Sequence, residues 1–141
     1  MVLSVTTRDS ASSPRAAGRR WIRVDRAALG RLPASFLEAT IAYEDPSFWT
    51  NRGYLFQDVL STALGGATRE TITQRLVGST ILPLEDLTKP AWMRVARESI
   101  LASRLTAAYH QERILEWYIN TAYYGNLAYG SDAAALVYFG K

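Results

Sequence analysis

The chain has 141 residues, of which 48% are hydrophobic and 21% charged, so it can form one globular domain with a core but is too short for two. It contains no cysteine, which excludes disulfides, thiolate metal sites and cysteine nucleophiles. Residues 1–31 carry seven arginines and two aspartates, so the net charge of +3 divides into +5 there and −2 over residues 32–141. Because the basic character belongs to the N-terminal segment, we expect no nucleic-acid partner.

Residues 1–19 are rich in serine, threonine, alanine and arginine and lack an apolar period, so we predict a disordered segment before a domain at residues 20–141. Residues 21–25 alternate between apolar and polar types and predict a short extended segment. The chain has neither the apolar core of about 7–15 residues of a signal peptide nor the run of about 20 of a membrane span.

The first predicted helix runs from Pro33 to Glu44, with apolar residues recurring on one face. Asp45 precedes Pro46, which pushes Asp45 out of the helical region, so the helix should end near Glu44 and Asp45 should cap the following turn. Glu44 would then lie at a helix end.

The chemistry of Glu44 depends on its neighbours. A carboxylate shielded from water by Ile41, Tyr43 and Phe48 would suit general acid or base catalysis. The alternative is an acidic pair on a solvated helix end, which is the commoner meaning of such a pattern. These residues alone leave both open.

A short helix is predicted over residues 56–64, ended by two glycines, and a longer one over residues 91–109, which follows Pro90. On the longer helix Glu98 shares an apolar face with Ala102 and Leu105, and Arg94 lies one turn earlier. A carboxylate on an apolar face needs a partner, and Arg94 is the nearest candidate. An ordinary ion pair and a functional site both fit this pattern.

The last third predicts a helix over residues 111–120, an aromatic loop punctuated by glycine, and a final helix capped by Ser131. Most of its residues are predicted to serve packing. His110 is the only histidine in the chain, so we interpret it as a surface or capping residue rather than a metal ligand.

Four blocks over residues 33–141 resemble, in order, the signatures of the peptidoglycan glycosyltransferases, glycosyltransferase family 51. Residues 44–53 read E-D-P-S-F-W-T-N-R-G, against the pattern E-D-x-x-F-x-x-H-x-G. Residues 71–77 read T-I-T-Q-R-L-V, against T-I-T-Q-Q-L. Residues 94–105 read R-V-A-R-E-S-I-L-A-S-R-L, against R-K-x-x-E-x-x-x-A-x-x-L. Residues 109–141 resemble Y-S-K-x-E-I-L-E-x-Y-L-N, Y-F-G-N-G-A-Y-G and A-A-x-x-Y-F-G-K.

Several positions depart from this pattern, chiefly where it has a cation. Gly78 stands for a lysine thought to face the phosphate-bearing substrate, and Pro90 for an arginine that contacts phosphate. Because a diphosphate leaving group needs cations, we expect weak or no polymerisation, unless Lys89, Arg75 and Arg94 refill the space. Other departures are Asn51 for histidine, T-R-E for G-G-S at residues 68–70, Arg75 for glutamine, Ser79 for asparagine, Val95 for lysine and Thr106 for the last acid of the third signature.

The resemblance implies an all-α, lysozyme-like domain with a cleft between two lobes, which agrees with the helical patterns. Since family members continue past the F-G-K motif, we expect this chain to be truncated before the last helices. The implied activity is inverting polymerisation of lipid II, at the extracytoplasmic face of the bacterial cytoplasmic membrane. Expected partners are lipid II, the nascent glycan chain, the membrane surface and other cell-wall synthesis proteins.

The resemblance also assigns roles to residues. Glu44 would be the general base that takes the proton of the acceptor 4-hydroxyl. Glu98 would help to stabilise the departing diphosphate through an arginine or a divalent cation, with Mg²⁺ or Mn²⁺ as the candidates. The expected substrate-binding residues are Asp45, Phe48, Thr71, Thr73, Gln74, Arg75, Lys89 and Arg94.

Three functions therefore compete. The first is an active peptidoglycan glycosyltransferase. The second is a degenerate, non-catalytic relative that binds lipid-linked glycan or a cell-wall partner, favoured by residues 69–70, Gly78 and Pro90. The third is a lysozyme-like hydrolase with Glu44 as general acid. The hydrolase is the weakest, because it leaves the T-I-T-Q motif unexplained.

Overall fold

A computed structural model describes residues 28–66, 69–82 and 90–140. The segments predicted at residues 1–19 and 21–25, and the candidate Lys89, lie outside these ranges. Within them the fold is all-α, as predicted, and the only β-type pairing is an isolated bridge between Tyr123 and Tyr129. After the short 3-10 helix η1 (Leu29–Arg31) come α1 (Ala34–Glu44), α2 (Phe56–Ala63), α3 (Ile72–Thr80), α4 (Ala91–Ala108), α5 (Gln111–Thr121) and α6 (Ser131–Phe139).

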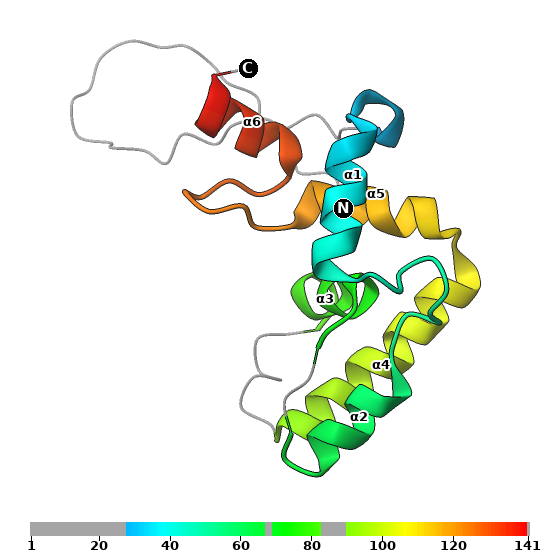
Figure 1. Cartoon of the computed structure of the whole chain (residues 1–141). Coiled ribbons are helices and arrows are strands. Elements are labelled where there is room, and N and C mark those ends of the chain that lie inside the picture. Colours follow the sequence, from blue (N-terminus) through cyan, green and yellow to red (C-terminus); the bar gives the residue numbers. More distant parts are fainter. Residues whose placement is uncertain (1–27, 67–68, 83–89, 141) are drawn as a thin grey trace, which may run out of the picture.

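The helices form two groups with α3 between them (Figure 1). On one side α2 packs along α4, and on the other α1, α5 and α6 lie together. Helix α3 packs against both α4 and α5, so it connects the two groups. This arrangement matches the two-lobed helical domain that the family resemblance implies, and it places α3 where residues from both lobes can meet.

Proline determines where two of these helices begin or end. Pro33 is the N-cap of α1, which ends at Glu44 because Asp45, just before Pro46, adopts an extended φ of −155°. Pro90 is the N-cap of α4. The predicted helices over residues 33–44, 56–64, 91–109 and 111–120 are therefore confirmed to within one or two residues.

The predicted cap of the last helix is wrong. Gly130, not Ser131, is the N-cap of α6, and its φ of +87° is one that glycine adopts readily. A Cβ atom at residue 130 would lie 2.7 Å from the Asn120 backbone oxygen, so the close approach of α5 also requires glycine. Ser131 is already helical and buried, and its hydroxyl has no hydrogen-bond partner among the described residues.

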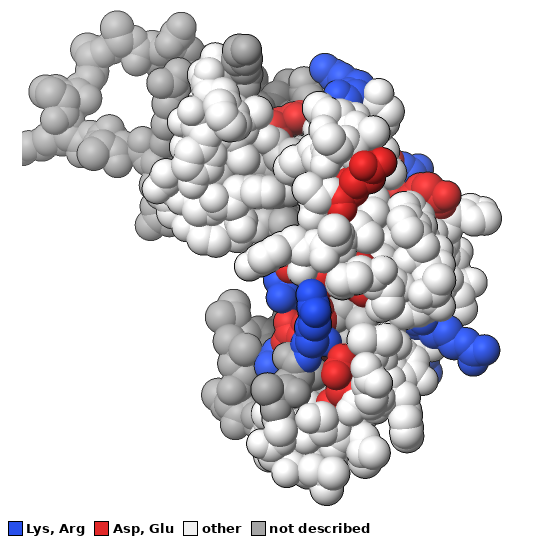
Figure 2. Space-filling view, in the orientation of Figure 1, with Lys and Arg blue, Asp and Glu red and all other residues white. Residues whose placement is uncertain are grey.

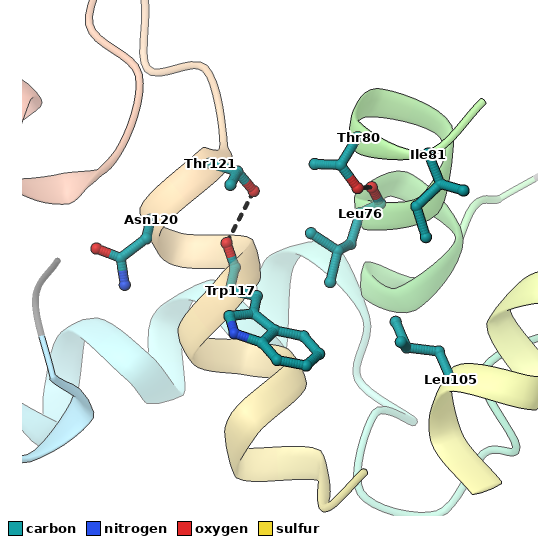
Figure 3. Close-up of a pocket in the computed structure, with 7 residues that line it drawn as sticks. All are labelled: Leu76, Thr80, Ile81, Leu105, Trp117, Asn120 and Thr121. Atoms are coloured by element: carbon teal, nitrogen blue, oxygen red, sulfur yellow. Dashed lines mark hydrogen bonds between the residues drawn. The ribbon is translucent and has the colours of Figure 1, made fainter. Parts of the chain in front are cut away.

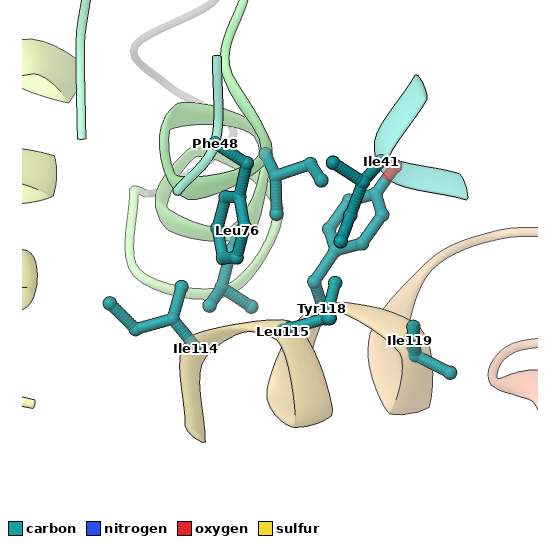
Figure 4. Close-up of a cluster of buried hydrophobic side chains, with 8 residues drawn as sticks. Ile41, Phe48, Leu76, Ile114, Leu115, Tyr118 and Ile119 are labelled. Atoms are coloured by element: carbon teal, nitrogen blue, oxygen red, sulfur yellow. The ribbon is translucent and has the colours of Figure 1, made fainter. Parts of the chain in front are cut away.

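The core is an aliphatic and aromatic cluster where α1, α3 and α5 meet (Figure 4). Burial of each large apolar side chain contributes about 1.5–3 kcal/mol, so this cluster fixes the end of α1 against α3. The charged residues described below depend on that placement. The buried members are Ile41, Phe48, Ile72, Leu76, Ile114, Leu115, Tyr118 and Ile119.

Among the described residues, no helix is both long enough and apolar enough to cross a bilayer.

Candidate active site

Five charged side chains form a continuous chain of ion pairs from α1 through α3 to α4. Arg75 Nη1 lies 2.5 Å from Glu44 Oε2, and Arg75 Nε lies 4.0 Å from Glu70 Oε2. Arg94 Nη1 lies 3.4 Å from Glu70 Oε1 and 3.0 Å from Glu98 Oε1. We call these five residues the charge cluster. It joins the two glutamates that separate sequence motifs single out.

The local structure explains how each member reaches the cluster. Glu44 is the last residue of α1, Arg75 lies in the first half of α3, and Glu70 precedes the N-cap of that helix. Arg94 and Glu98 are one turn apart on α4, so the predicted pairing between them is confirmed. Figure 2 shows acidic and basic side chains interleaved on one face of the molecule.

Exposure differs sharply along the charge cluster. The Glu98 side chain is 3% exposed, whereas those of Glu44 and Glu70 are 21% and 30% exposed. The guanidinium-bearing side chains of Arg75 and Arg94 are 43% and 31% exposed. Water or a ligand can therefore reach both arginines, while Glu98 is buried beneath Arg94.

The surroundings of Glu44 differ in part from those expected. Tyr43 is 80% exposed and therefore shields little of the carboxylate from water, although it lines the same cavity as Glu44. The close neighbour of the carboxylate is instead Arg75, which belongs to another helix. Glu44 also lines a cavity of about 310 Å³ whose walls come mainly from α1, the end of α5 and the aromatic loop that follows.

Two tyrosines of this cavity were missed by the sequence analysis. Burial raises the pKa of Tyr118, and the negative charge of Glu44 adds to the rise. Burial raises the pKa of Tyr124 to about 12, with smaller contributions from Tyr118 and Glu44. Both phenols therefore stay protonated at neutral pH and can donate hydrogen bonds. No sequence spacing connects them with Glu44, since only the packing of α5 against α1 brings them together.

Asp45 lies next to Glu44 in the sequence but is engaged in a buried clamp. Its carboxylate accepts hydrogen bonds from the Ser47 hydroxyl at 2.8 Å, the Asn51 amide at 2.9 Å and the Ile72 backbone N–H at 3.2 Å. Asn51, which replaces the histidine of the family pattern, also accepts from Gly53 N at 2.8 Å. The clamp ties the turn after α1 to the first residue of α3.

Thr71 and Gln74 continue the same clamp. They form a capping box at the start of α3, and the Thr71 hydroxyl donates to Gly53 O at 2.6 Å. The Gln74 amide donates to the Ser99 hydroxyl on α4 at 3.1 Å. Both side chains, like Thr73, are almost fully buried. Their predicted contact with sugar or phosphate oxygens stays a prediction, because their hydrogen bonds in this conformation go to the protein itself.

Phe48 also lies in the interior. Its side chain is 1% exposed in the core cluster, and its ring meets Trp49 edge-on at a centroid distance of 5.0 Å. Its backbone oxygen accepts a hydrogen bond from the Gln111 amide at 2.8 Å. In this conformation Phe48 therefore contributes packing rather than a surface that a substrate could touch.

Gly78, where the family pattern has lysine, faces Glu98. A Cβ atom at residue 78 would lie 3.0 Å from Glu98 Oε1, so a lysine side chain there would begin beside this carboxylate. Arg94, which matches the arginine of the family pattern, pairs with Glu98. Arg94 is therefore a cation beside the position where the expected lysine is missing.

The divalent cation expected at Glu98 stays a prediction. Among residues 28–66, 69–82 and 90–140, no three acidic or histidine side chains come close enough together to hold a metal ion. Glu98, the candidate ligand, pairs with Arg94. Guanidinium groups are the positive charges that the described site itself can offer to a phosphate.

The chain is similar in sequence to known proteins. A family model described as Transglycosylase matches residues 13–141. Penicillin-binding protein 2D of Bacillus subtilis (strain 168) is 34% identical over 116 residues, which cover 76% of this chain and 16% of that protein. Penicillin-binding protein 1A of Escherichia coli (strain K12) is 35% identical over 120 residues, 80% of this chain and 14% of that protein.

Penicillin-binding protein 1A of Mycobacterium tuberculosis (strain ATCC 25618 / H37Rv) is 32% identical over 119 residues, covering 80% of this chain and 14% of its own length. The chain therefore spans only 14–16% of the length of these three relatives. The similarity concerns one part of each of those proteins.

Proposed function

The chain belongs to the transglycosylase family, and from this premise we propose that it is a peptidoglycan glycosyltransferase that polymerises lipid II into glycan strands. The reaction would transfer the growing strand from its lipid diphosphate to the 4-hydroxyl of the next lipid II molecule, with inversion at the anomeric carbon. It would take place at the extracytoplasmic face of the bacterial cytoplasmic membrane.

One observation carries this proposal: the two candidate glutamates lie on a single charge cluster, although they come from motifs far apart in the sequence. Glu44 lies at one end and Glu98 at the other, joined through Arg75, Glu70 and Arg94. The cavity beside Glu44 combines aromatic walls with hydroxyl groups and a carboxylate, and binding sites for small ligands generally combine such surfaces.

In the proposed reaction Glu44 accepts the proton of the acceptor 4-hydroxyl as the hydroxyl oxygen attacks the anomeric carbon of the donor. The bond between that carbon and the diphosphate oxygen breaks, and its electron pair leaves with the diphosphate. Arg75 and Arg94 stabilise the negative charge that develops there. Glu98 acts through Arg94, which it holds at 3.0 Å.

The test is polymerisation of lipid II in detergent micelles, with and without added Mg²⁺. Glu44→Gln should lower the rate about 10²–10⁴-fold, the usual contribution of a general base. Glu38→Gln is the matched control, because Glu38 is an exposed acid on the same helix and should leave the rate unchanged. Transfer by Glu44→Gln at the unmutated rate would refute the assigned role.

A second candidate is a non-catalytic relative that binds lipid-linked glycan or a cell-wall partner. It is favoured by the ion pairs that both glutamates form with arginines and by the glycine beside Glu98. The same assay separates the candidates, because this relative would bind lipid II without joining it. A hydrolase would instead cleave finished glycan strands.

A further inference from the structure

Glu70 lies between the two exposed arginines of the charge cluster. One carboxylate oxygen, Oε1, faces Arg94 Nη1 at 3.4 Å, and the other, Oε2, faces Arg75 Nε at 4.0 Å. A single anionic group thus bridges two guanidiniums that come from different helices. Arginine recognises phosphate through the same fork of N–H groups that it offers to a carboxylate.

Glu70 is the most loosely held acid of the cluster. Glu44 and Glu98 lie 2.5 and 3.0 Å from their arginines, in direct ion-pair contact. The 3.4 and 4.0 Å separations of Glu70 are longer, and its side chain is 30% exposed. An incoming anion could therefore exchange with the Glu70 carboxylate without disturbing the contacts of Glu44 and Glu98.

We propose that Arg75 and Arg94 form a binding site for a diphosphate group and that Glu70 occupies this site in the free protein, so that the diphosphate must displace its carboxylate. The inference rests on the proposed function, since the ligand it names is the diphosphate of a lipid-linked sugar donor. Glu70 thereby becomes a residue that sets the affinity for that donor.

Charge balance supports the exchange. The cluster contains three carboxylates and two guanidiniums and is therefore net negative while Glu70 is ionised. Once the Glu70 carboxylate has moved away, the remaining four charges balance. A further guanidinium, that of Arg69, lies close by, because its Nη2 donates to the Tyr43 backbone oxygen at 3.0 Å. A diphosphate therefore meets less repulsion after displacing Glu70 than before.

Two departures from the family pattern create this arrangement. Glu70 stands where the pattern has serine and Arg75 where it has glutamine. The carboxylate and the guanidinium are both absent from the pattern, and in this chain they face each other. Occupation of the site by the Glu70 carboxylate is thus specific to this chain. A serine at residue 70 would leave the site without that carboxylate.

The experiment measures binding of inorganic pyrophosphate to residues 1–141 by calorimetry at low salt. Glu70→Gln and Glu70→Ser should each bind pyrophosphate about tenfold more tightly than the unmutated chain, because one repelling charge is removed from a partly exposed site. Adding Arg75→Gln to either variant should abolish that gain. Glu116→Gln is the matched control, since Glu116 pairs with Arg113 at 3.0 Å outside the cluster.

An unchanged affinity in both Glu70 variants, or an equal gain in Glu116→Gln, would overturn the proposal. So would an absence of pyrophosphate binding in every variant whose circular dichroism and thermal melting match those of the unmutated chain. Farnesyl diphosphate serves as a second ligand that carries a prenyl chain. A gain for pyrophosphate without one for farnesyl diphosphate would overturn the assignment to a lipid-linked diphosphate.

These outcomes are independent of the polymerisation assay, because no sugar is transferred in the binding experiment. A pyrophosphate gain without polymerisation would support the anion site and count against the glycosyltransferase activity. Polymerisation without a gain in pyrophosphate affinity would support the glycosyltransferase activity and count against the anion site.

Discussion

Glu44 and Asp45 are adjacent acids with opposite surroundings. Asp45 is 3% exposed, and its carboxylate accepts hydrogen bonds from two side chains and two backbone N–H groups. The Glu44 side chain is 21% exposed, lines a cavity and pairs with Arg75, which is itself 43% exposed. The helix ends between them, so their side chains enter different environments.

The difference separates a residue that builds the site from one that can react in it. Removing Asp45 would leave buried donors without an acceptor, which costs more free energy than the bonds themselves contribute. Glu44 can exchange its partner, because both it and Arg75 reach solvent. Substitutions in the clamp around Asp45 should therefore affect stability, whereas substitutions in the charge cluster should affect it little.

The largest effect on stability is expected from Asp45→Ala. It should lower the free energy of unfolding by about 3 kcal/mol or more, because the Asn51 amide and the Ile72 N–H lose a buried charged acceptor. Glu44→Ala should lower it by less than about 1 kcal/mol, since its ion pair is partly exposed. Urea unfolding of both variants measures the two losses of unfolding free energy. Equal losses in the two variants would contradict the prediction.

A second pair of variants compares Thr71, the N-cap of α3, with Arg75 in the same helix. Thr71→Ala should cost about 1–2 kcal/mol, because the capping box and the hydrogen bond to Gly53 are lost. Arg75→Gln, one turn later, should cost less than about 1 kcal/mol because it removes a partly exposed ion pair. Chemical denaturation followed by helical circular dichroism checks both. A greater loss for Arg75→Gln would assign the charge cluster a structural role.

The smallest effect concerns alkaline pH and the tyrosines beside Glu44. The pKa of Tyr118 is raised, and that of Tyr124 is raised to about 12, above the ordinary value of 10.0. The unfolded chain therefore releases these protons at lower pH than the folded protein does. Their contribution to stability is complete below pH 10 and is lost as the pH rises toward 12.

Tyr124→Phe should weaken that alkaline loss, because phenylalanine has no proton to release. Tyr109→Phe is the control, since Tyr109 is 49% exposed and lies apart from the cavity. Unfolding free energies measured from pH 8 to 12 would detect the change. An identical pH dependence in the Tyr124→Phe variant and the unmutated chain would show that Tyr124 does not contribute to the loss of stability at alkaline pH.

The sequence by itself determined the helices and several of their ends. Proline fixes the backbone locally, so the ends at Glu44 and after Pro90 follow from two or three residues. The Arg94–Glu98 pair follows from the helical repeat for the same reason. Family signatures singled out Glu44 and Glu98, although spacing alone left their chemistry open.

Only the tertiary structure decided which of these residues meet. The contact of Glu44 with Arg75, the position of Glu70 between two arginines and the bond from Ile72 to Asp45 all join different segments of the chain. Helical periodicity gives the face on which a side chain lies but not the element that covers it. That choice is made by burial of the apolar cluster between α1, α3 and α5, which places the charged residues as it forms.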